Sequence, residues 1–402
     1  MARKTTRTHR KTAPASLQLD ETTVEQFLRS GEHAQALAAY FGEAEYAELR
    51  ELALRAAAVR TRGGPRVYVL PGIMGSKIGK PGRVFNDVLW LDPVDVIAGR
   101  LIRLALPRGQ ALQALGVMLF GYLKLKLTLE IAGFDASFHA FDWRQSLETL
   151  GSELVERIER DPAGSVSLVT HSMGGLVARA AMLRDTERRI MRIVQLGTPN
   201  YGSFAPVQAF RATYPTVRKI AALDTKHTAE DLARKVFRTL PGLYQMLPSP
   251  ERQPGLDFFD IESWPHDGLL PDAALLTQAR QVQTALAPAD DRCHLIAGVN
   301  QETVTAATRR GQGFEYVVTR DGDGTVPLAL ARWEGAATWY IDESHGGLTN
   351  NGTVATATID LLRTGRTTRL ADSWQPRRRR VIRRVRDSEL RRIAAGKLRW
   401  ED

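Results

Sequence analysis

A serine in a sharp turn between a strand-like run and a helical run constrains the fold more than any other feature of this sequence. Residues 164–169 are predicted to form a buried strand, residues 174–183 are predicted to form a helix, and Ser172 lies in the turn between them. Such a turn is tight, so it needs small residues near the serine, and two glycines begin the helix. Thr170 stands where the usual pattern has a glycine. The arrangement predicts that Ser172 is a nucleophile at the carboxyl end of a strand.

Four more short β-rich runs recur along the chain, and helical runs separate them. They cover residues 66–70, 190–196, 294–299 and 338–341. Strands that alternate with helices predict an α/β fold, in which a mostly parallel sheet has helices on both faces. In such sheets the functional residues lie at the carboxyl ends of the strands.

Two long apolar segments, 79–130 and 203–275, fit this alternation poorly. Each leaves the sheet beside a turn that is predicted to be functional. One interpretation is that they form cap or lid insertions over an apolar substrate. The other is ordinary helical packing, since both segments must bury their apolar surface somewhere. The sequence leaves both interpretations open.

A nucleophilic serine needs a base, and the base needs an acid to orient it. In folds of this kind the chain order is serine, acid, histidine. Asp323 lies between two glycines, and His345, which follows the last predicted strand, is the only histidine after it. We therefore expect Asp323 and His345 to complete the site, with Asp321 as the alternative acid. A calcium loop at 321–325 is disfavoured because it lacks the terminal glutamate. His171 is expected to be structural and to point away from the serine.

The negatively charged oxygen of an acyl-transfer intermediate needs two amide donors. One predicted donor is the amide of Met173, which directly follows the serine. The other is expected in the loop after an early strand, where we choose the amide of Ile73 and keep the amide of Met74 as the alternative. A plain Pro-Gly turn with no such role is the other interpretation of this loop.

The chain has a net charge of +10, and the positive charge gathers at its ends. Residues 1–19 hold five Lys and Arg and no acid, and residues 363–402 hold 14 Lys and Arg and five acids. We expect 1–19 to be a basic disordered tail and 363–402 a basic C-terminal tail. The second tail could form a basic amphipathic helix for an anionic membrane surface. Nucleic acid is a less favoured partner because few aromatic residues accompany the arginines, and a merely solubilising tail is the simplest alternative.

Residues 20–62 are predicted to form a helical N-terminal extension, and a Gly-Gly-Pro break there begins a main domain that spans 63–362. The single cysteine, Cys293, excludes an internal disulfide. The sequence shows neither a signal peptide nor an apolar run long enough to span a bilayer. These features predict a cytoplasmic protein that can bind peripherally to a membrane. Cys293 and His294 lack a spaced partner cluster and no phosphate loop is present, so we expect no metal and no cofactor.

Several motifs together resemble the lecithin:cholesterol acyltransferase family, which includes lysosomal phospholipase A2 and phospholipid:diacylglycerol acyltransferases. They are LPGIMGS (70–76), FDWR (141–144), HSMGG (171–175), LGTPNYGS (196–203), YQMLPS (244–249), GDGTVP (322–327) and SHG (344–346). The resemblance implies an α/β-hydrolase fold over about 66–362. By position it implies that Ser172 is the nucleophile, Asp323 the acid and His345 the base, with Ile73 and Met173 as the oxyanion amides. Asp142-Trp143-Arg144 matches a motif that we interpret as a structural charge pair.

Two hypotheses from different classes follow. The first is a serine lipase or esterase that acts on an apolar acyl ester, with O-acyltransferase activity if an alcohol outcompetes water for the acyl-enzyme. The second is an inert hydrolase fold that serves as a binding or scaffold protein, because a fold does not dictate activity. The complete set of Ser172, Asp323 and His345 favours the first hypothesis. Acyl length, acceptor and oligomeric state are left open by the sequence.

Overall fold

The structure is a computed structural model that describes residues 20–59, 63–82, 86–107, 111–376 and 381–393. The predicted tail 1–19, the arginine run 377–380 and the end of the chain at 394–402 lie outside the described residues. Within the described ranges, no helix is both long enough and apolar enough to span a bilayer.

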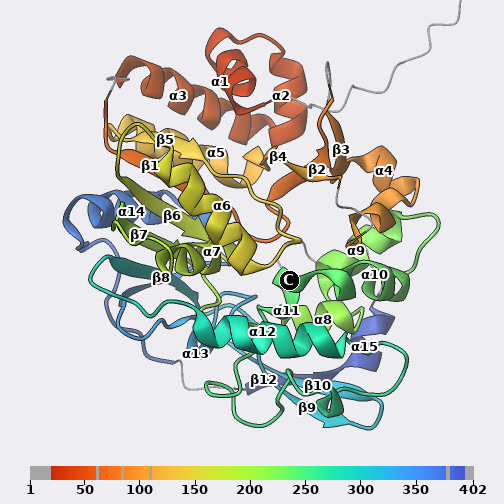
Figure 1. Ribbon diagram of the computed structural model, residues 1–402. Helices are drawn as coiled ribbons and strands as arrows, with labels where there is room; N and C mark the ends of the chain where they lie inside the picture. Colours follow the sequence, from red (N-terminus) through yellow and green to blue (C-terminus); the bar gives the residue numbers. More distant parts are fainter. Residues whose placement is uncertain (1–19, 60–62, 83–85, 108–110, 377–380, 394–402) are drawn as a thin grey trace, which may run out of the picture.

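Six parallel strands form the central sheet in the order β11-β8-β7-β6-β1-β5, of which Figure 1 labels β8 to β5. Every adjacent pair is parallel, and Leu70 of β1 stands opposite Thr170 of β6. The strands are β1 (Arg66–Leu70), β5 (Asp135–Phe138), β6 (Val166–His171), β7 (Ile190–Leu196), β8 (Cys293–Val299) and β11 (Ala337–Asp342). The parallel sheet confirms the predicted α/β class. Five of its strands were predicted, and β5 was not.

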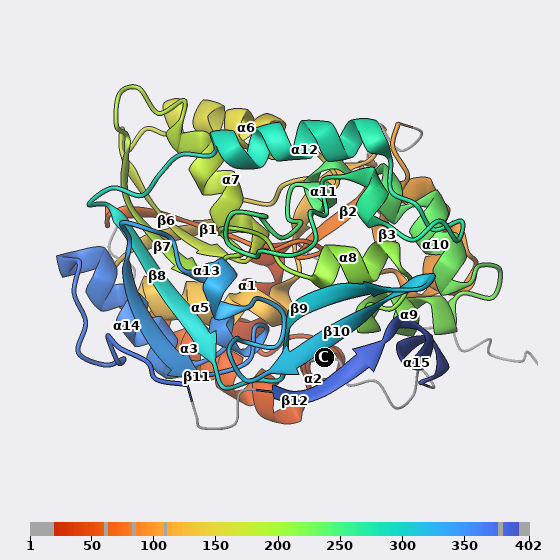
Figure 2. The same ribbon diagram turned by 90° about the horizontal axis from the view of Figure 1, so that it is seen from below.

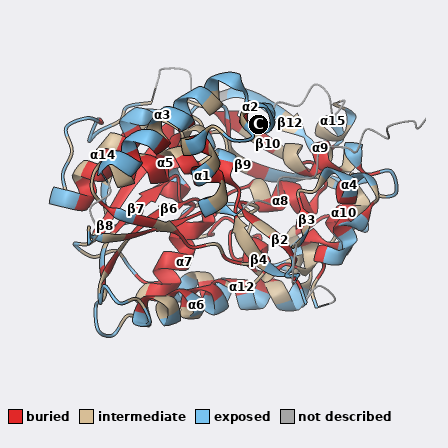
Figure 3. Ribbon diagram, turned by 90° about the horizontal axis from the view of Figure 1, so that it is seen from above, coloured by how far each residue is buried: buried red, intermediate tan, exposed pale blue. Residues whose placement is uncertain are grey.

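Helices cover both faces of this sheet (Figure 2). Leu168 of β6 belongs to a buried cluster with the inner residues of α6 and α7, whereas the next residue, Val169, belongs to a second cluster with α5 and α14. Successive strand residues point to opposite faces, so a sheet that is covered twice needs continuous apolar strands. Figure 3 shows these strands as almost wholly buried. The four helices are α5 (Leu119–Ile131), α6 (Leu147–Glu159), α7 (Met173–Met182) and α14 (Gly352–Thr364).

The N-terminal extension consists of three helices that pack on the sheet cover. Val24 of the first helix and Val67 of β1 lie in the same buried cluster. Lys126 of α5 is buried, and its Nζ lies 2.7 Å from Glu21 and 2.5 Å from Glu25. These ion pairs join the extension to the core. The helices, which the sequence predicted, are α1 (Glu21–Ser30), α2 (Ala34–Phe41) and α3 (Glu43–Val59).

The two apolar insertions pack against each other beside the sheet (Figure 1). The carbonyl oxygen of Ile97 in the first insertion accepts hydrogen bonds from the amide and the hydroxyl of Thr225 in the second, at 3.3 and 2.7 Å. Val96 and Phe210, one from each insertion, lie in the same buried cluster as the sheet residue Leu168. The end of the segment 79–130 is α5, which covers the sheet. That part is therefore ordinary packing and not a cap.

The first insertion contains a small antiparallel sheet of order β3-β2-β4 and two short helices. These elements are β2 (Ser76–Lys80), β3 (Asp87–Trp90), α4 (Pro93–Ile97), the 3-10 helix η1 (Arg100–Leu104) and β4 (Gln113–Val117). The second insertion is helical. It contains α8 (Ala205–Phe210), α9 (Pro215–Leu223), α10 (Ala229–Lys235), η2 (Phe237–Thr239), α11 (Pro241–Tyr244) and η3 (Ile261–Ser263), and α12 (Ala273–Ala285) follows it.

The C-terminal segment joins a third sheet, which is antiparallel with the order β12-β10-β9. The prediction of one basic helix is wrong for Val381–Arg386, which forms strand β12 against β10. Three of its six residues are valine or isoleucine, and β-branched residues favour a paired strand. The remaining elements are β9 (Thr303–Arg310), β10 (Gly313–Thr319), α13 (Leu328–Ala331), η4 (Gly347–Thr349) and α15 (Asp387–Arg392).

Candidate active site

Ser172 occupies a sharp turn between β6 and α7. Its backbone has φ 53° and ψ −124°, a conformation that L-residues rarely adopt. A side-chain carbon on Gly175 would lie only 2.0 Å from the hydroxyl of Thr198, so the helix can approach its neighbour only with a glycine there. Thr170 is a regular strand residue paired with Leu70, which explains why a β-branched residue is accepted at that position.

Asp323 and His345 lie together at the carboxyl edge of the sheet. His345 Nδ1 is 2.8 Å from Asp323 Oδ2, and the amide of His345 donates to the Asp323 carbonyl oxygen at 2.7 Å. The other carboxylate oxygen of Asp323 accepts hydrogen bonds from the amides of Thr325 and Val326 at 3.0 and 2.7 Å. Asp323 is only 2% exposed, so these donors replace water around its charge.

The alternative acid, Asp321, has different contacts. Its carbonyl oxygen accepts the amide of Leu328 at 2.8 Å, and its amide donates to the Thr319 hydroxyl at 3.0 Å. The structure therefore brings Asp323, and not Asp321, to His345.

The end of β7 connects the Asp323–His345 pair to Ser172. The amide of Ser172 donates to the Leu196 carbonyl oxygen at 3.0 Å. A side-chain carbon on the next residue, Gly197, would lie 3.0 Å from Asp323 Oδ2 and 3.1 Å from His345 Nδ1. Asp323 and His345 thus lie against the glycine that follows Leu196, the residue to which the Ser172 amide donates. Ser172 is 6% exposed, and its hydroxyl has no hydrogen-bond partner among the residues that the structure describes.

The loop after β1 lies directly against the serine. A side-chain carbon on Gly72 would lie 2.9 Å from Ser172 Cβ and 3.4 Å from its Oγ. The amide of Gly75 donates to the Gly72 carbonyl oxygen at 3.0 Å, and Met74 has φ 62°, so the loop is a tight turn with Ile73 in it. The Met74 carbonyl oxygen accepts the indole N–H of Trp90 at 2.9 Å.

The two amides predicted to hold an oxyanion are that of Ile73, in this loop, and that of Met173, at the start of α7. Met173 is the first residue of the helix, so its N–H has no partner within the helix. Across the described part of the chain, neither amide donates to another backbone group.

The ring of His171, which was expected to be structural and to point away from the serine, packs against the ring of His345. The ring centroids are 4.7 Å apart, and His171 Nε2 lies 3.0 Å from the His345 carbonyl oxygen. Burial, with a smaller contribution from His345, lowers the pKa of His171 to about 3, so the ring is neutral at pH 7.

Tyr122 of α5 is the residue that sequence reasoning missed. Its hydroxyl lies 3.0 Å from His171 Nδ1 and accepts the amide of Gly72 at 2.9 Å. Burial raises its pKa to about 12. It was overlooked because it lies within an apolar run that favours a packing or cap helix, and no local pattern marks it.

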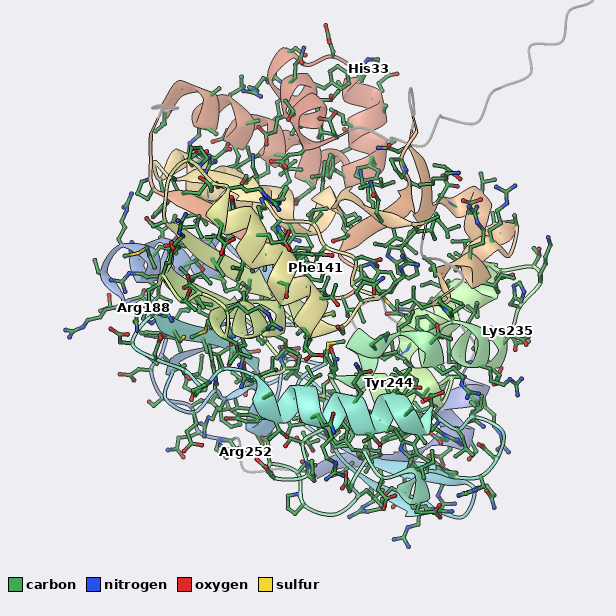
Figure 4. All side chains as sticks on the ribbon, viewed as in Figure 1. His33, Phe141, Arg188, Lys235, Tyr244 and Arg252 are labelled. Carbon is green, nitrogen blue, oxygen red and sulfur yellow. The ribbon has the colours of Figure 1, made fainter. Side chains whose placement is uncertain are left out.

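The Asp142–Arg144 motif has the structural role that its sequence suggested. The Arg144 guanidinium is fully buried and contacts Asp142 at 2.7 and 2.8 Å. It also donates to the carbonyl oxygens of Leu104 and Leu112. The motif therefore ties the first insertion to the sheet, next to the buried Phe141 (Figure 4). No group of three or more His, Cys, Asp or Glu side chains in the described ranges is placed to hold a metal ion.

The sequence matches the lecithin:cholesterol acyltransferase (LCAT) family over residues 129–280. A chain of the Tle4–Tli4 complex is 13% identical with a TM-score of 0.46, and the alignment covers 74% of this chain and 98% of that chain. The mature form of Bacillus licheniformis lipase BlEst2 is 13% identical with a TM-score of 0.38, covering 75% and 92%. Phospholipase PlaB from Legionella pneumophila is 12% identical with a TM-score of 0.35, covering 75% and 57%. A comparison with curated protein sequences finds no match.

Proposed function

We propose that this LCAT-like α/β-hydrolase is a serine hydrolase that cleaves carboxylic esters of lipids through an acyl-enzyme. The family match supports a lipid-acting hydrolase or acyltransferase. The observation that carries the finer proposal is the Asp323–His345 contact at 2.8 Å beside the strained turn of Ser172. An inert scaffold would have no need for that strained conformation.

In the proposed reaction the Ser172 hydroxyl oxygen attacks the ester carbonyl carbon while His345 Nε2 takes the hydroxyl proton. Asp323 holds the Nδ1 proton and stabilises the imidazolium. The amides of Ile73 and Met173 donate to the oxyanion of the tetrahedral intermediate. When the intermediate collapses, the alcohol leaves with the proton from His345, and the acyl group remains on Ser172.

A second nucleophile then releases the acyl group by the same steps in reverse. Water yields a fatty acid, and an alcohol yields a new ester, with His345 again taking the proton of the attacking group. The triad residues serve both outcomes equally. The choice depends on which acceptor the surrounding insertions admit to the acyl-enzyme.

We also propose that the basic C-terminal segment contacts an anionic lipid surface. The side chains of Arg383, Arg384 and Arg386 on β12 are all more than half exposed, and each also lies within 3.5 Å of a carboxylate, that of Glu302 or Glu315. Cations in such a position are attracted to anionic headgroups. Replacing all three with glutamine should weaken binding to vesicles that contain phosphatidylglycerol and leave binding to pure phosphatidylcholine vesicles unchanged. Equal loss of binding to duplex DNA would instead indicate nucleic acid.

The direct test is hydrolysis of p-nitrophenyl esters from short to long acyl chains, with and without vesicles. We expect activity in the wild type and a loss of at least about a thousandfold in Ser172→Ala. Ser152→Ala is the matched control, because the Ser152 hydroxyl only donates to a carbonyl oxygen within α6. A wild type that is inactive on every ester, or a Ser172→Ala variant that stays active, would refute the proposal. Adding a long-chain alcohol and measuring the new ester separates transfer from hydrolysis.

A further inference from the structure

A buried chain of polar groups joins the loop of Gly72 to the backbone of His345. The Gly72 amide donates to the Tyr122 hydroxyl oxygen at 2.9 Å, and that oxygen lies 3.0 Å from His171 Nδ1. On the far side of the ring, His171 Nε2 lies 3.0 Å from the His345 carbonyl oxygen. Tyr122 and His171 are both buried, so water does not replace these contacts.

The protons of this chain can be arranged in one way only. The Gly72 amide is a donor, which leaves the Tyr122 O–H free to donate to His171 Nδ1. The His345 carbonyl oxygen is an acceptor, so His171 Nε2 must carry the proton that faces it. A neutral imidazole carries one proton, and this assignment uses it with no buried group unpaired. Both neighbours of His171 therefore select the same tautomer.

The same helix end touches both loops at separate points. Just before α5, the amide of Met118 donates to the Gly75 carbonyl oxygen at 2.9 Å. Asn350, which follows the His345 loop, donates from its side chain to the Phe120 carbonyl oxygen at 3.4 Å. The N-terminal turn of α5 is thus the common support for the loop beside the serine and the loop that carries the histidine.

We propose that Tyr122 and His171 are positioning residues that hold the oxyanion loop and His345 in register across Ser172; this inference rests on the proposed function. Tyr122 fixes the position of the Gly72 amide and therefore the position of the next amide, that of Ile73. His171 holds the His345 carbonyl oxygen, while Asp323 holds its amide and its ring. A displacement of about 1 Å of either loop would lower kcat and leave KM nearly unchanged, because the oxyanion contact is made in the transition state.

The test compares Tyr122→Phe with Tyr244→Phe. The control tyrosine, labelled in Figure 4, is also buried. Its hydroxyl accepts the amide of Asp272 at 2.8 Å and donates to the carbonyl oxygen of Arg238 at 2.7 Å. We expect Tyr122→Phe to lower kcat by about 10- to 100-fold with KM within about twofold of the wild type, and Tyr244→Phe to keep the wild-type kcat. Equal kcat values for the two variants, or a change confined to KM, would overturn the proposal.

Variants of His171 test the other half of the chain. His171→Gln can still donate to the His345 carbonyl oxygen, whereas His171→Leu cannot, so glutamine should retain more kcat. If the two residues act as one unit, Tyr122→Phe combined with His171→Leu should lose little more than the worse single variant. If the kcat losses of the two single variants multiply in the double variant, or if the glutamine and leucine variants are equally active, Tyr122 and His171 do not act through one hydrogen-bond chain.

Nuclear magnetic resonance of the full chain with ¹⁵N-labelled histidine provides a readout that needs no turnover. We expect His171 to carry its proton on Nε2 in the wild type and to lose that single tautomer in Tyr122→Phe. Amide exchange at Gly72 should become faster in the same variant. A proton on His171 Nδ1 would refute the proposed hydrogen-bond chain, even in an active enzyme. An inactive wild type with the expected tautomer would instead overturn the ester-hydrolase proposal and leave the chain supported.

Discussion

Replacing Asp387 should weaken the packing of the C-terminal segment, residues 381–393, against the rest of the protein. Asp387 begins α15 and is 3% exposed. Its carboxylate accepts hydrogen bonds from Arg211 Nε at 2.9 Å, the Phe314 amide at 3.1 Å and the Tyr316 hydroxyl at 2.8 Å. The substitution Asp387→Ala removes all three contacts at once and leaves the amide, the hydroxyl and part of the guanidinium without their acceptor.

The expected cost follows from these contacts. Breaking a buried ion pair by removing one partner costs about 3–5 kcal/mol of unfolding free energy. The Arg211 guanidinium keeps a second carboxylate, that of Asp267, at 2.6 Å from both of its terminal nitrogens. We therefore expect the lower figure, about 3 kcal/mol. An unfolding entropy of about 2.1 cal/mol/K for each residue, taken over 402 residues, converts this loss to a fall in Tm of about 4 °C.

The assay is urea unfolding at 25 °C together with a thermal melt of the full chain. Asp291→Ala is the matched control, because the Asp291 side chain is 89% exposed and should change the unfolding free energy by less than about 0.5 kcal/mol. If Asp387→Ala is as stable as Asp291→Ala, the hydrogen bonds from Arg211, Phe314 and Tyr316 to Asp387 do not anchor the C-terminal segment, and the reasoning fails.

Two further predictions concern the active-site loop and acid stability. Gly72→Ala places a carbon 2.9 Å from Ser172 Cβ and 3.2 Å from His171 Nδ1, so we expect kcat to fall by about 10- to 100-fold. The control is Gly352→Ala, whose added carbon enters open space and should leave kcat unchanged. Similar kcat values for the two variants would contradict the close approach of Gly72 to the serine. Burial lowers the pKa of both His139 and His171 to about 3, below the usual 6.5, so the unfolded state binds more protons in acid. Their contribution to stability is complete above pH 6.5 and is lost as the pH falls toward 3, by about 1.4 kcal/mol per pH unit for each histidine. Urea titrations at several pH values should show a slope reduced by that amount in His171→Gln, and an unchanged slope would refute the assignment.

Local patterns predicted much of the central sheet. The runs 66–70 and 190–196 coincide with β1 and β7, and the turn at Ser172 lies where the strand and helix patterns meet. These features depend on a few neighbouring residues, because strand burial needs a continuous apolar run and a sharp turn needs small residues. The strand β5 was missed because its four residues, Asp-Ala-Ser-Phe, carry no such run.

Longer-range features were harder to predict. From its sequence, the arginine-rich segment 381–386 was predicted to be part of a charged tail. Its pairing with β10 could not be predicted, because a run of charged residues does not indicate which strand it pairs with. The choice of Asp323 over Asp321 followed from chain order and the flanking glycines. The structure adds the contact that distinguishes them, the 2.8 Å approach of Asp323 to His345.

By itself, the sequence determined the α/β class, the serine turn and the small set of residues from which a nucleophile, base and acid could be chosen, since these depend on local periodicity and turn chemistry. Only the tertiary structure decided that α5 covers the sheet, that β12 completes a third sheet, and that Tyr122 meets His171 across 49 positions of the chain. Such contacts depend on how packed helices align in three dimensions, and nothing in the residues next to Tyr122 encodes that alignment.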